Sequence, residues 1–211
     1  MSDVLNSVDS HNLDIFKEIG NIGAGNAATA LAGMLNKKVL MSVPEVNIVS
    51  FNDIINILDG PENVVVGILV DMSGGLSGYI LMVLEVEDAY ELISIAMNEE
   101  KKPPENFNAD SLNELEKSSL TEMTNILVGA YLSAICSLTN LTVKPSVPQL
   151  AIDMVGAIIS IVAIEYGKIG DSVLFLKTNF SDENKDMTGH FFLIPDFESY
   201  KILIESLGMS I

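Results

Sequence analysis

The chain has 211 residues, of which 48% are hydrophobic and 19% are charged, and its formal net charge is −18 at pH 7. This composition is typical of a globular protein that can bury a substantial core, and it excludes a disordered chain. The charge argues against nucleic acid and anionic membranes as partners, because binding them requires lysines and arginines that neutralise phosphates. We therefore expect a partner with a basic or metal-bearing face, although solubility alone would account for the charge equally well.

The hydrophobic pattern predicts the same series of elements in each half of the chain, and a charged, turn-prone stretch at residues 98–105 separates the halves. Each half is expected to form a long helix, then strands, then a shorter helix. In the first half these are a helix from about Asp9 or Ser10 to Leu35, strands near 45–51, 64–72 and 78–86 with a hairpin loop at 74–78, and a helix at 86–97. In the second half they are a helix from about Ser111 to Leu138, strands near 151–164, 171–178 and 188–194, and a helix at 197–207. Ser111 and Glu114 form a capping-box pattern where the second long helix is expected to begin.

Neither a membrane span nor a cysteine-based site is expected. The apolar stretch at 154–164 is about half of the roughly 20 residues that a spanning helix needs, and its β-branched residues favour a buried strand. The acidic, polar first residues do not resemble a signal peptide. Cys136 is the only cysteine, so no internal disulfide and no cysteine-based zinc site can form. We expect a cytoplasmic protein.

The two halves are related by a duplication, because matching residues recur at a constant offset of 104 positions, as from Glu18 to Glu122. The pairs at this offset include Asp14 with Ser118, Glu18 with Glu122, Asn21 with Asn125, Gly25 with Gly129, and Pro44 with Pro148. Neither half has enough strands to cover its helices well. We therefore predict a two-layer α+β fold, in which helix–strands–helix halves at about 9–100 and 110–211 form one domain around a continuous sheet.

Within each long helix the repeated polar residues form one narrow stripe, since positions three and four apart lie on one helix face. Asparagine is a poor helix former whose amide competes with the backbone, so an asparagine at the same helical position in both halves indicates a role for its side chain. The two stripes are Asp14, Glu18, Asn21 and Gly25, and Ser118, Glu122, Asn125 and Gly129.

The amide and the carboxylate of each stripe suit hydrolysis of an acyl phosphate, a reaction that depends mostly on positioning and charge stabilisation. A carboxamide presents a donor and an acceptor at one point, so it can hold a water molecule while it faces a phosphate oxygen. A glutamate one turn earlier can bind a lysine or arginine of a partner. The spacing alone leaves open the alternative that each stripe is simply a solvated helix face.

Other residues in these segments are expected to be structural. Gly20-x2-Gly23-x-Gly25 has the wrong order of spacings for a dinucleotide-binding loop and follows no strand. We expect these glycines to let the two long helices approach closely, at a cost of roughly 1 kcal/mol each relative to alanine. Pro44 and Pro148 are expected to end the connection from helix to strand and to set the start of the strand.

The pattern [Asp or Ser]-x3-Glu-x2-Asn-x22-Pro resembles the signature of the CheC/CheX/FliY phosphatases of bacterial and archaeal chemotaxis. It occurs here as Asp14-x3-Glu18-x2-Asn21-x22-Pro44 and as Ser118-x3-Glu122-x2-Asn125-x22-Pro148, and the words KEIGNIGAGNAATAL around the first copy also resemble those of CheC. Two copies in one chain resemble the two-site CheC proteins rather than the single-site, dimeric CheX. The longer FliY proteins add a flagellar switch domain, for which 211 residues leave no room.

This resemblance implies a CheC-like fold and a phosphatase that hydrolyses the aspartyl phosphate of the response regulator CheY. It implies that the magnesium ion belongs to CheY, so that this chain has no cofactor or metal site of its own, and that the receptor deamidase CheD is a second partner. The implied roles are water positioning for Asn21 and Asn125, binding of a basic receiver residue for Glu18 and Glu122, and support for Asp14 and Ser118.

Two other functions stay open at this point. The chain would serve equally as a non-catalytic module that docks on a receiver or on CheD and regulates it by sequestration. It would also serve as a structural piece of the flagellar switch. The phosphatase differs from both in requiring that the two asparagines accelerate loss of phosphate from CheY.

Overall fold

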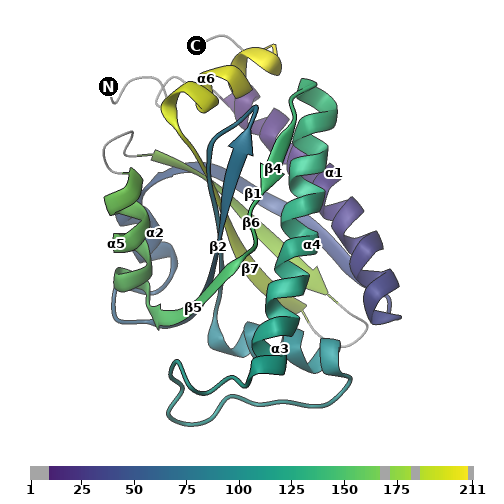
Figure 1. The fold of residues 1–211 in the computed structure, drawn as a ribbon, viewed down its shortest axis with the longest axis vertical. Helices are drawn as coiled ribbons and strands as arrows, with labels where there is room; N and C mark the ends of the chain where they lie inside the picture. Colours follow the sequence, from purple (N-terminus) through teal and green to yellow (C-terminus); the bar gives the residue numbers. More distant parts are fainter. Residues whose placement is uncertain (1–9, 167–171, 182–185, 209–211) are drawn as a thin grey trace.

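The computed structural model describes residues 10–166, 172–181 and 186–208. Within these ranges the chain forms six helices and seven strands (Figure 1). In chain order they are α1 (Ser10–Leu35), β1 (Leu40–Ser50), α2 (Phe51–Ile57), β2 (Val64–Gly74), β3 (Gly78–Leu84), α3 (Val86–Met97), α4 (Glu114–Thr139), β4 (Val143–Pro145), β5 (Gln149–Met154), α5 (Val155–Tyr166), β6 (Ser172–Ser181), β7 (Asp186–Pro195) and α6 (Phe197–Ser206). No helix of the described ranges is long and apolar enough to cross a membrane.

The strands form one antiparallel sheet in the order β1-β6-β7-β3-β2, and both β4 and β5 pair with β2. The order is symmetric about the central β7–β3 pair, with β6 and β2 next to that pair and β1 and β5 at the two sides. Strands of both halves are therefore interleaved in one sheet, which confirms the α+β fold with an internal duplication and one continuous sheet. The residue boundaries proposed for the two repeats stay a prediction.

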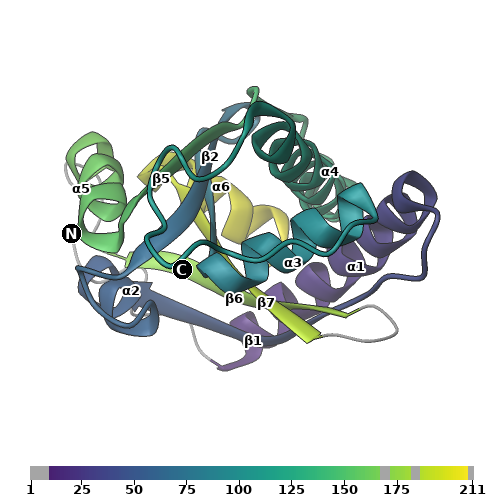
Figure 2. The ribbon, with the colours of Figure 1, turned by 90° about the horizontal axis from the view of Figure 1, so that it is seen from below.

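Both faces of the sheet bury apolar side chains (Figures 1 and 2). The larger core lies under α1, α3, α4 and α6, where Leu31 and Leu127 pack with Ile68 and Ile80 of the sheet. A smaller core lies on the other face, under α2 and α5. The alternating direction of side chains along each strand divides its residues between the two cores.

The long helices α1 and α4 lie side by side on the larger core and run in opposite directions (Figure 1). A Cβ added at Gly23 would lie 2.6 Å from Cδ1 and 3.0 Å from Cα of Tyr131 on α4, so only glycine permits this approach. The hydroxyl of Tyr131 makes a 3.1 Å hydrogen bond with Thr178 of β6, and burial raises its pKa to about 12. The expectation of close helix packing is confirmed for Gly23. It is wrong for Gly20, where a Cβ would meet Leu176 and Val43 of the sheet, and for Gly25, where it would meet nothing within 4 Å.

The strand predicted at 151–164 is wrong in its second part. The strand β5 ends at Met154, and α5 begins at Val155. The residues of α5 in the smaller core are Val155, Ile158, Ile159 and Val162, and their spacing of three and four positions is that of a helix. The β-branched residues of this segment favoured the prediction of a strand over that of a helix. The matching helix α2, 104 positions earlier, was also not predicted, and it begins at a capping box of Ser50 and Asp53.

The second long helix begins at Glu114, three residues later than expected. Its N-cap is Asn113, whose Oδ1 accepts hydrogen bonds of 3.0 Å from the backbone N–H groups of both Leu115 and Glu116. The carboxylate of Glu116 accepts in return from the backbone N–H of Asn113 at 2.9 Å. The capping box is therefore Asn113 with Glu116, and the Ser111–Glu114 prediction is wrong.

Candidate functional site

Both polar stripes lie on the exposed faces of α1 and α4, which cover the larger core. The side chains of Asp14, Glu18 and Asn21 are exposed on α1, and those of Ser118, Glu122 and Asn125 are exposed on α4. The residues between them, such as Phe16 and Ile19 on α1 and Leu120 and Met123 on α4, are buried in the larger core. The 26-residue helices thus hold each set of predicted site residues together on one face.

The first asparagine is attached to the neighbouring strand. Oδ1 of Asn21 accepts a 2.9 Å hydrogen bond from the backbone N–H of Val43 in β1, and its Nδ2 donates to the carbonyl oxygens of Lys17 at 3.0 Å and of Val43 at 3.5 Å. The register between β1 and β6 shifts between Ser42 and Glu45, so the peptide groups of Val43 lie in a β-bulge. The carboxamide of Asn21 therefore bonds backbone groups that lack a place in the strand ladder.

The second asparagine has no such attachment. Asn125 makes no side-chain hydrogen bond to any residue of the described ranges. The residue equivalent to Val43 is Val147, and it is 79% exposed whereas Val43 is 1% exposed. The preceding residue, Ser146, is bonded to β2 instead, because its backbone N–H donates to the carbonyl of Asp71 at 2.9 Å and its hydroxyl accepts from the Asp71 N–H at 3.0 Å. The two sites thus share a sequence pattern and differ in whether the amide is engaged.

The two prolines of the pattern occupy different positions. Pro44 lies inside β1, at the bulge, so the expectation that it sets the start of the strand is wrong for this residue. Bulges tolerate proline because the residue there needs no ladder hydrogen bond. Pro148 immediately precedes β5, as expected. The sequence reasoning missed the Val43 backbone as the partner of Asn21, although the bulge at Pro44 follows naturally from a proline in a strand.

The glutamates of both stripes are free to meet a partner. Neither Glu18 nor Glu122 forms an ion pair or a hydrogen bond with another residue of the described ranges. An exposed, unpaired carboxylate one turn before an amide attracts a cationic side chain of a docking protein. The role expected for these two residues stays a prediction.

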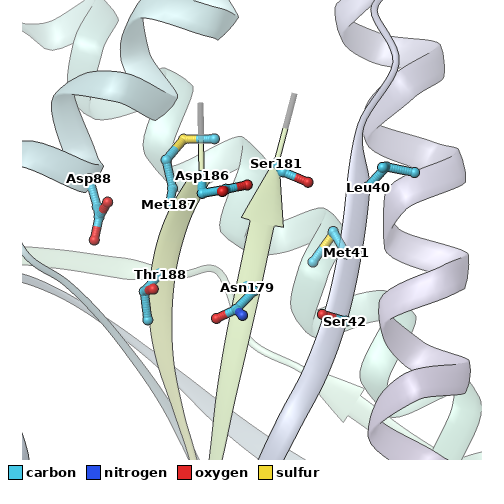
Figure 3. Close-up of a pocket in the computed structure, with 9 residues that line it drawn as sticks. All are labelled: Leu40, Met41, Ser42, Asp88, Asn179, Ser181, Asp186, Met187 and Thr188. Carbon is cyan, nitrogen blue, oxygen red and sulfur yellow. The ribbon is translucent and has the colours of Figure 1, made fainter. Parts of the chain in front are cut away.

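A separate polar pocket of about 440 Å³ opens between α3 and the ends of β1, β6 and β7 (Figure 3). Its lining contains none of the predicted site residues. Burial raises the pKa of its Asp88, and the hydrogen bond from the backbone N–H of Thr188 opposes part of that rise. Within the described ranges, no group of three or more His, Cys, Asp or Glu side chains is placed to hold a metal ion. The lining residues are Leu40, Met41, Ser42, Asp88, Asn179, Ser181, Asp186, Met187 and Thr188.

His190 of β7 is a partly buried titratable group away from both stripes. Its ring stacks on Phe175 with centroids 5.9 Å apart, and its Nδ1 has no hydrogen-bond partner among the described residues. Burial lowers the pKa of His190 to about 4, and the charge of Lys177 lowers it further, while the carboxylates of Asp59 and Glu45 oppose the shift. The imidazole is therefore neutral at physiological pH.

The fold and the stripes define a class of α+β protein that exposes the same polar pattern on each of two adjacent helices. A model of the CheC-like family matches residues 12–48, the segment that holds the first stripe, the bulge and Pro44. The chain is 32% identical over 210 residues to the CheY-P phosphatase CheC of Bacillus subtilis, and the match covers 99% of each chain. This protein belongs to the CheC-like family.

Further similarities agree with this assignment. The chain is 29% identical over 137 residues to the flagellar motor switch phosphatase FliY of Bacillus subtilis, which covers 65% of this chain and 34% of that protein. Among solved structures, FliY of Thermotoga maritima has a TM-score of 0.73 at 18% identity and covers 96% of this chain and 98% of that one. The FliM middle domain of H. pylori has a TM-score of 0.68 at 10% identity, with coverages of 94% and 99%. The structural matches show a shared fold.

Proposed function

We propose that this protein is a phosphatase that hydrolyses the aspartyl phosphate of the response regulator CheY. The observation that carries the proposal is the 32% identity to the CheY-P phosphatase CheC, which extends over 99% of both chains. The exposed Glu–Asn pairs on α1 and α4 support it, because each presents an amide and an unpaired carboxylate to solvent at the spacing of one helical turn.

The chemistry assigned to each pair follows from its groups. An exposed carboxamide on a rigid helix would position water for in-line attack on the phosphoryl group, and its NH₂ would face a phosphoryl oxygen. The glutamate one turn earlier would hold a basic residue of the receiver and so fix the helix against it. The water attacks the phosphorus directly, the bond to the aspartyl oxygen breaks, and inorganic phosphate leaves, so no residue of this chain is covalently modified.

We propose that the Asn125 site supplies the larger share of the activity. Its amide makes no hydrogen bond within the described ranges, so docking of the receiver would cost no internal contact. The amide of Asn21 would have to release the Val43 backbone before both its oxygen and its nitrogen faced a substrate. Breaking the hydrogen bonds of Asn21 would add to the cost of engaging a substrate at the first site, and no such cost arises at the second.

The remaining parts of the proposal rest on the family resemblance. The magnesium ion would be bound by CheY, and this chain would need no cofactor. CheD would be a second partner, and the protein would act in the cytoplasm, where the net charge of −18 suits a partner with a basic face.

The test is an assay of phosphate loss from phosphorylated CheY with the wild type, Asn21→Ala, Asn125→Ala and the double variant. We expect the wild type to accelerate the loss, Asn125→Ala to reduce the rate more than Asn21→Ala, and the double variant to abolish the acceleration. A wild type that binds phosphorylated CheY without accelerating phosphate loss would instead support the non-catalytic binding module. A double variant with full activity would refute the assignment of the water-positioning group.

A further inference from the structure

Gly25 and Gly129 follow the two asparagines by one helical turn and lie on the same exposed faces. A Cβ added at either glycine would meet no atom within 4 Å. The same addition at Gly20 would lie 3.1 Å from Leu176 and 3.2 Å from Val43, and at Gly23 it would press on Tyr131. The chain therefore has a packing reason for glycine at 20 and 23, and none at 25 and 129.

The backbone does not require glycine at these two positions either. Both lie inside long α-helices, and neither is among the glycines with positive φ, which are Gly60, Gly74, Gly78 and Gly208. Glycine destabilises a helix interior relative to alanine. A destabilising residue that stands at the equivalent place in both halves, without an internal reason, indicates a requirement from outside the chain.

The geometry of a helix shows what that requirement is. Side chains lean toward the helix N-terminus, so a residue covers the surface over the preceding turn. A side chain at position 25 would lie over Asn21, and one at position 129 would lie over Asn125. Glycine leaves the approach to each carboxamide open.

We propose that Gly25 and Gly129 are specificity-determining positions of the two sites. The missing side chain lets the active site of the phosphorylated receiver approach the helix closely enough for the amide to reach the phosphoryl group. This inference rests on the proposed function. It extends each site by one turn beyond the Glu–Asn pair and assigns that turn a steric role.

Gly33 of α1 offers a matched control. It is also exposed, and a Cβ there would likewise meet nothing within 4 Å. Its position is eight residues beyond Gly25, which places it about 80° around the helix from the stripe, and its counterpart in the second half is Ser137. Gly33→Ala and Gly33→Gln therefore add the same atoms to the same helix outside the site.

The experiment compares Gly25→Ala/Gly129→Ala and Gly25→Gln/Gly129→Gln with the two Gly33 variants. All of the alanine variants are expected to raise the Tm, by about 2–4 °C for each glycine replaced. The Gln pair is expected to lower kcat/KM for phosphorylated CheY about tenfold or more, and the Ala pair less, since steric interference grows with the added volume. The Gly33 variants should keep the wild-type kcat/KM.

Higher stability together with lower activity is a combination that a merely structural role would not produce. A Gln pair with wild-type kcat/KM, or site variants that lose stability, would overturn the inference. Binding to CheY carrying beryllofluoride in place of the phosphoryl group separates this inference from the proposed function. If the wild type binds without hydrolysing, the phosphatase proposal fails, and the inference is retained only if the Gln pair loses binding. If the wild type neither binds nor hydrolyses, both are refuted.

Discussion

The contrast between Asn21 and Asn125 leads to a prediction about stability that is independent of any substrate. Replacing Asn21 with alanine removes the 2.9 Å and 3.0 Å hydrogen bonds to the Val43 N–H and the Lys17 carbonyl, together with the longer contact to the Val43 carbonyl. Each well-formed hydrogen bond contributes about 1 kcal/mol, and alanine recovers about 0.5 kcal/mol of helix propensity. We therefore expect Asn21→Ala to lower the free energy of unfolding by about 1.5 kcal/mol.

The same substitution at Asn125 serves as the internal control. No hydrogen bond is lost there, so Asn125→Ala should leave stability unchanged or raise it by about 0.5 kcal/mol. The two variants should thus differ by about 2 kcal/mol, and their midpoints of thermal unfolding should differ by about 4–8 °C for a chain of this size. Urea and thermal denaturation followed by circular dichroism measure both quantities. Equal stabilities of the two variants would refute a stabilising role for the hydrogen bonds between Asn21 of α1 and Val43 of β1.

Three further predictions concern other parts of the molecule. Glu18→Gln together with Glu122→Gln should leave the Tm unchanged and raise KM for phosphorylated CheY about tenfold. The KM of this variant should also depend less on salt concentration than the KM of the wild type, which steady-state kinetics at several ionic strengths would measure. Gly23→Ala should lower the free energy of unfolding by about 1–3 kcal/mol, because the new methyl group would press on Tyr131; an unchanged urea midpoint would show that the helices can separate freely. Because the pKa of His190 is about 4 in the folded chain and 6.5 ordinarily, the contribution of this histidine to stability should be complete above pH 6.5. That contribution should fall by up to about 3 kcal/mol between pH 6.5 and 4. Urea unfolding at several pH values should lose this part of the pH dependence in His190→Gln, and an unaltered profile would contradict the shift.

Much of the fold was predictable because local pattern and tertiary packing agree. The long helix Ser10–Leu35 and the helix Val86–Met97 were predicted within a residue of their observed ends, since their apolar residues recur at the helical period. The segment 155–166 was mispredicted because nearly every position is apolar or small, which conceals the period that the smaller core selects. The capping box at Asn113 was missed because Ser111 and Glu114 satisfy the same pattern two residues earlier.

For the candidate site, the sequence by itself determined which residues share a face, because the spacing of three and four positions on a helix is a local property. It also determined the duplication, through the constant offset of 104 positions. Only the tertiary structure decided that the two sites differ. Asn21 and Asn125 stand in the same pattern, but β1 passes close to α1 with a bulge that exposes the Val43 peptide groups to Asn21. In the second half, hydrogen bonds between Ser146 and Asp71 hold the equivalent connection against β2, and Asn125 is left without a partner in the described ranges. The reason is that the partner of a backbone group in a strand is set by sheet pairing with residues far away in the chain.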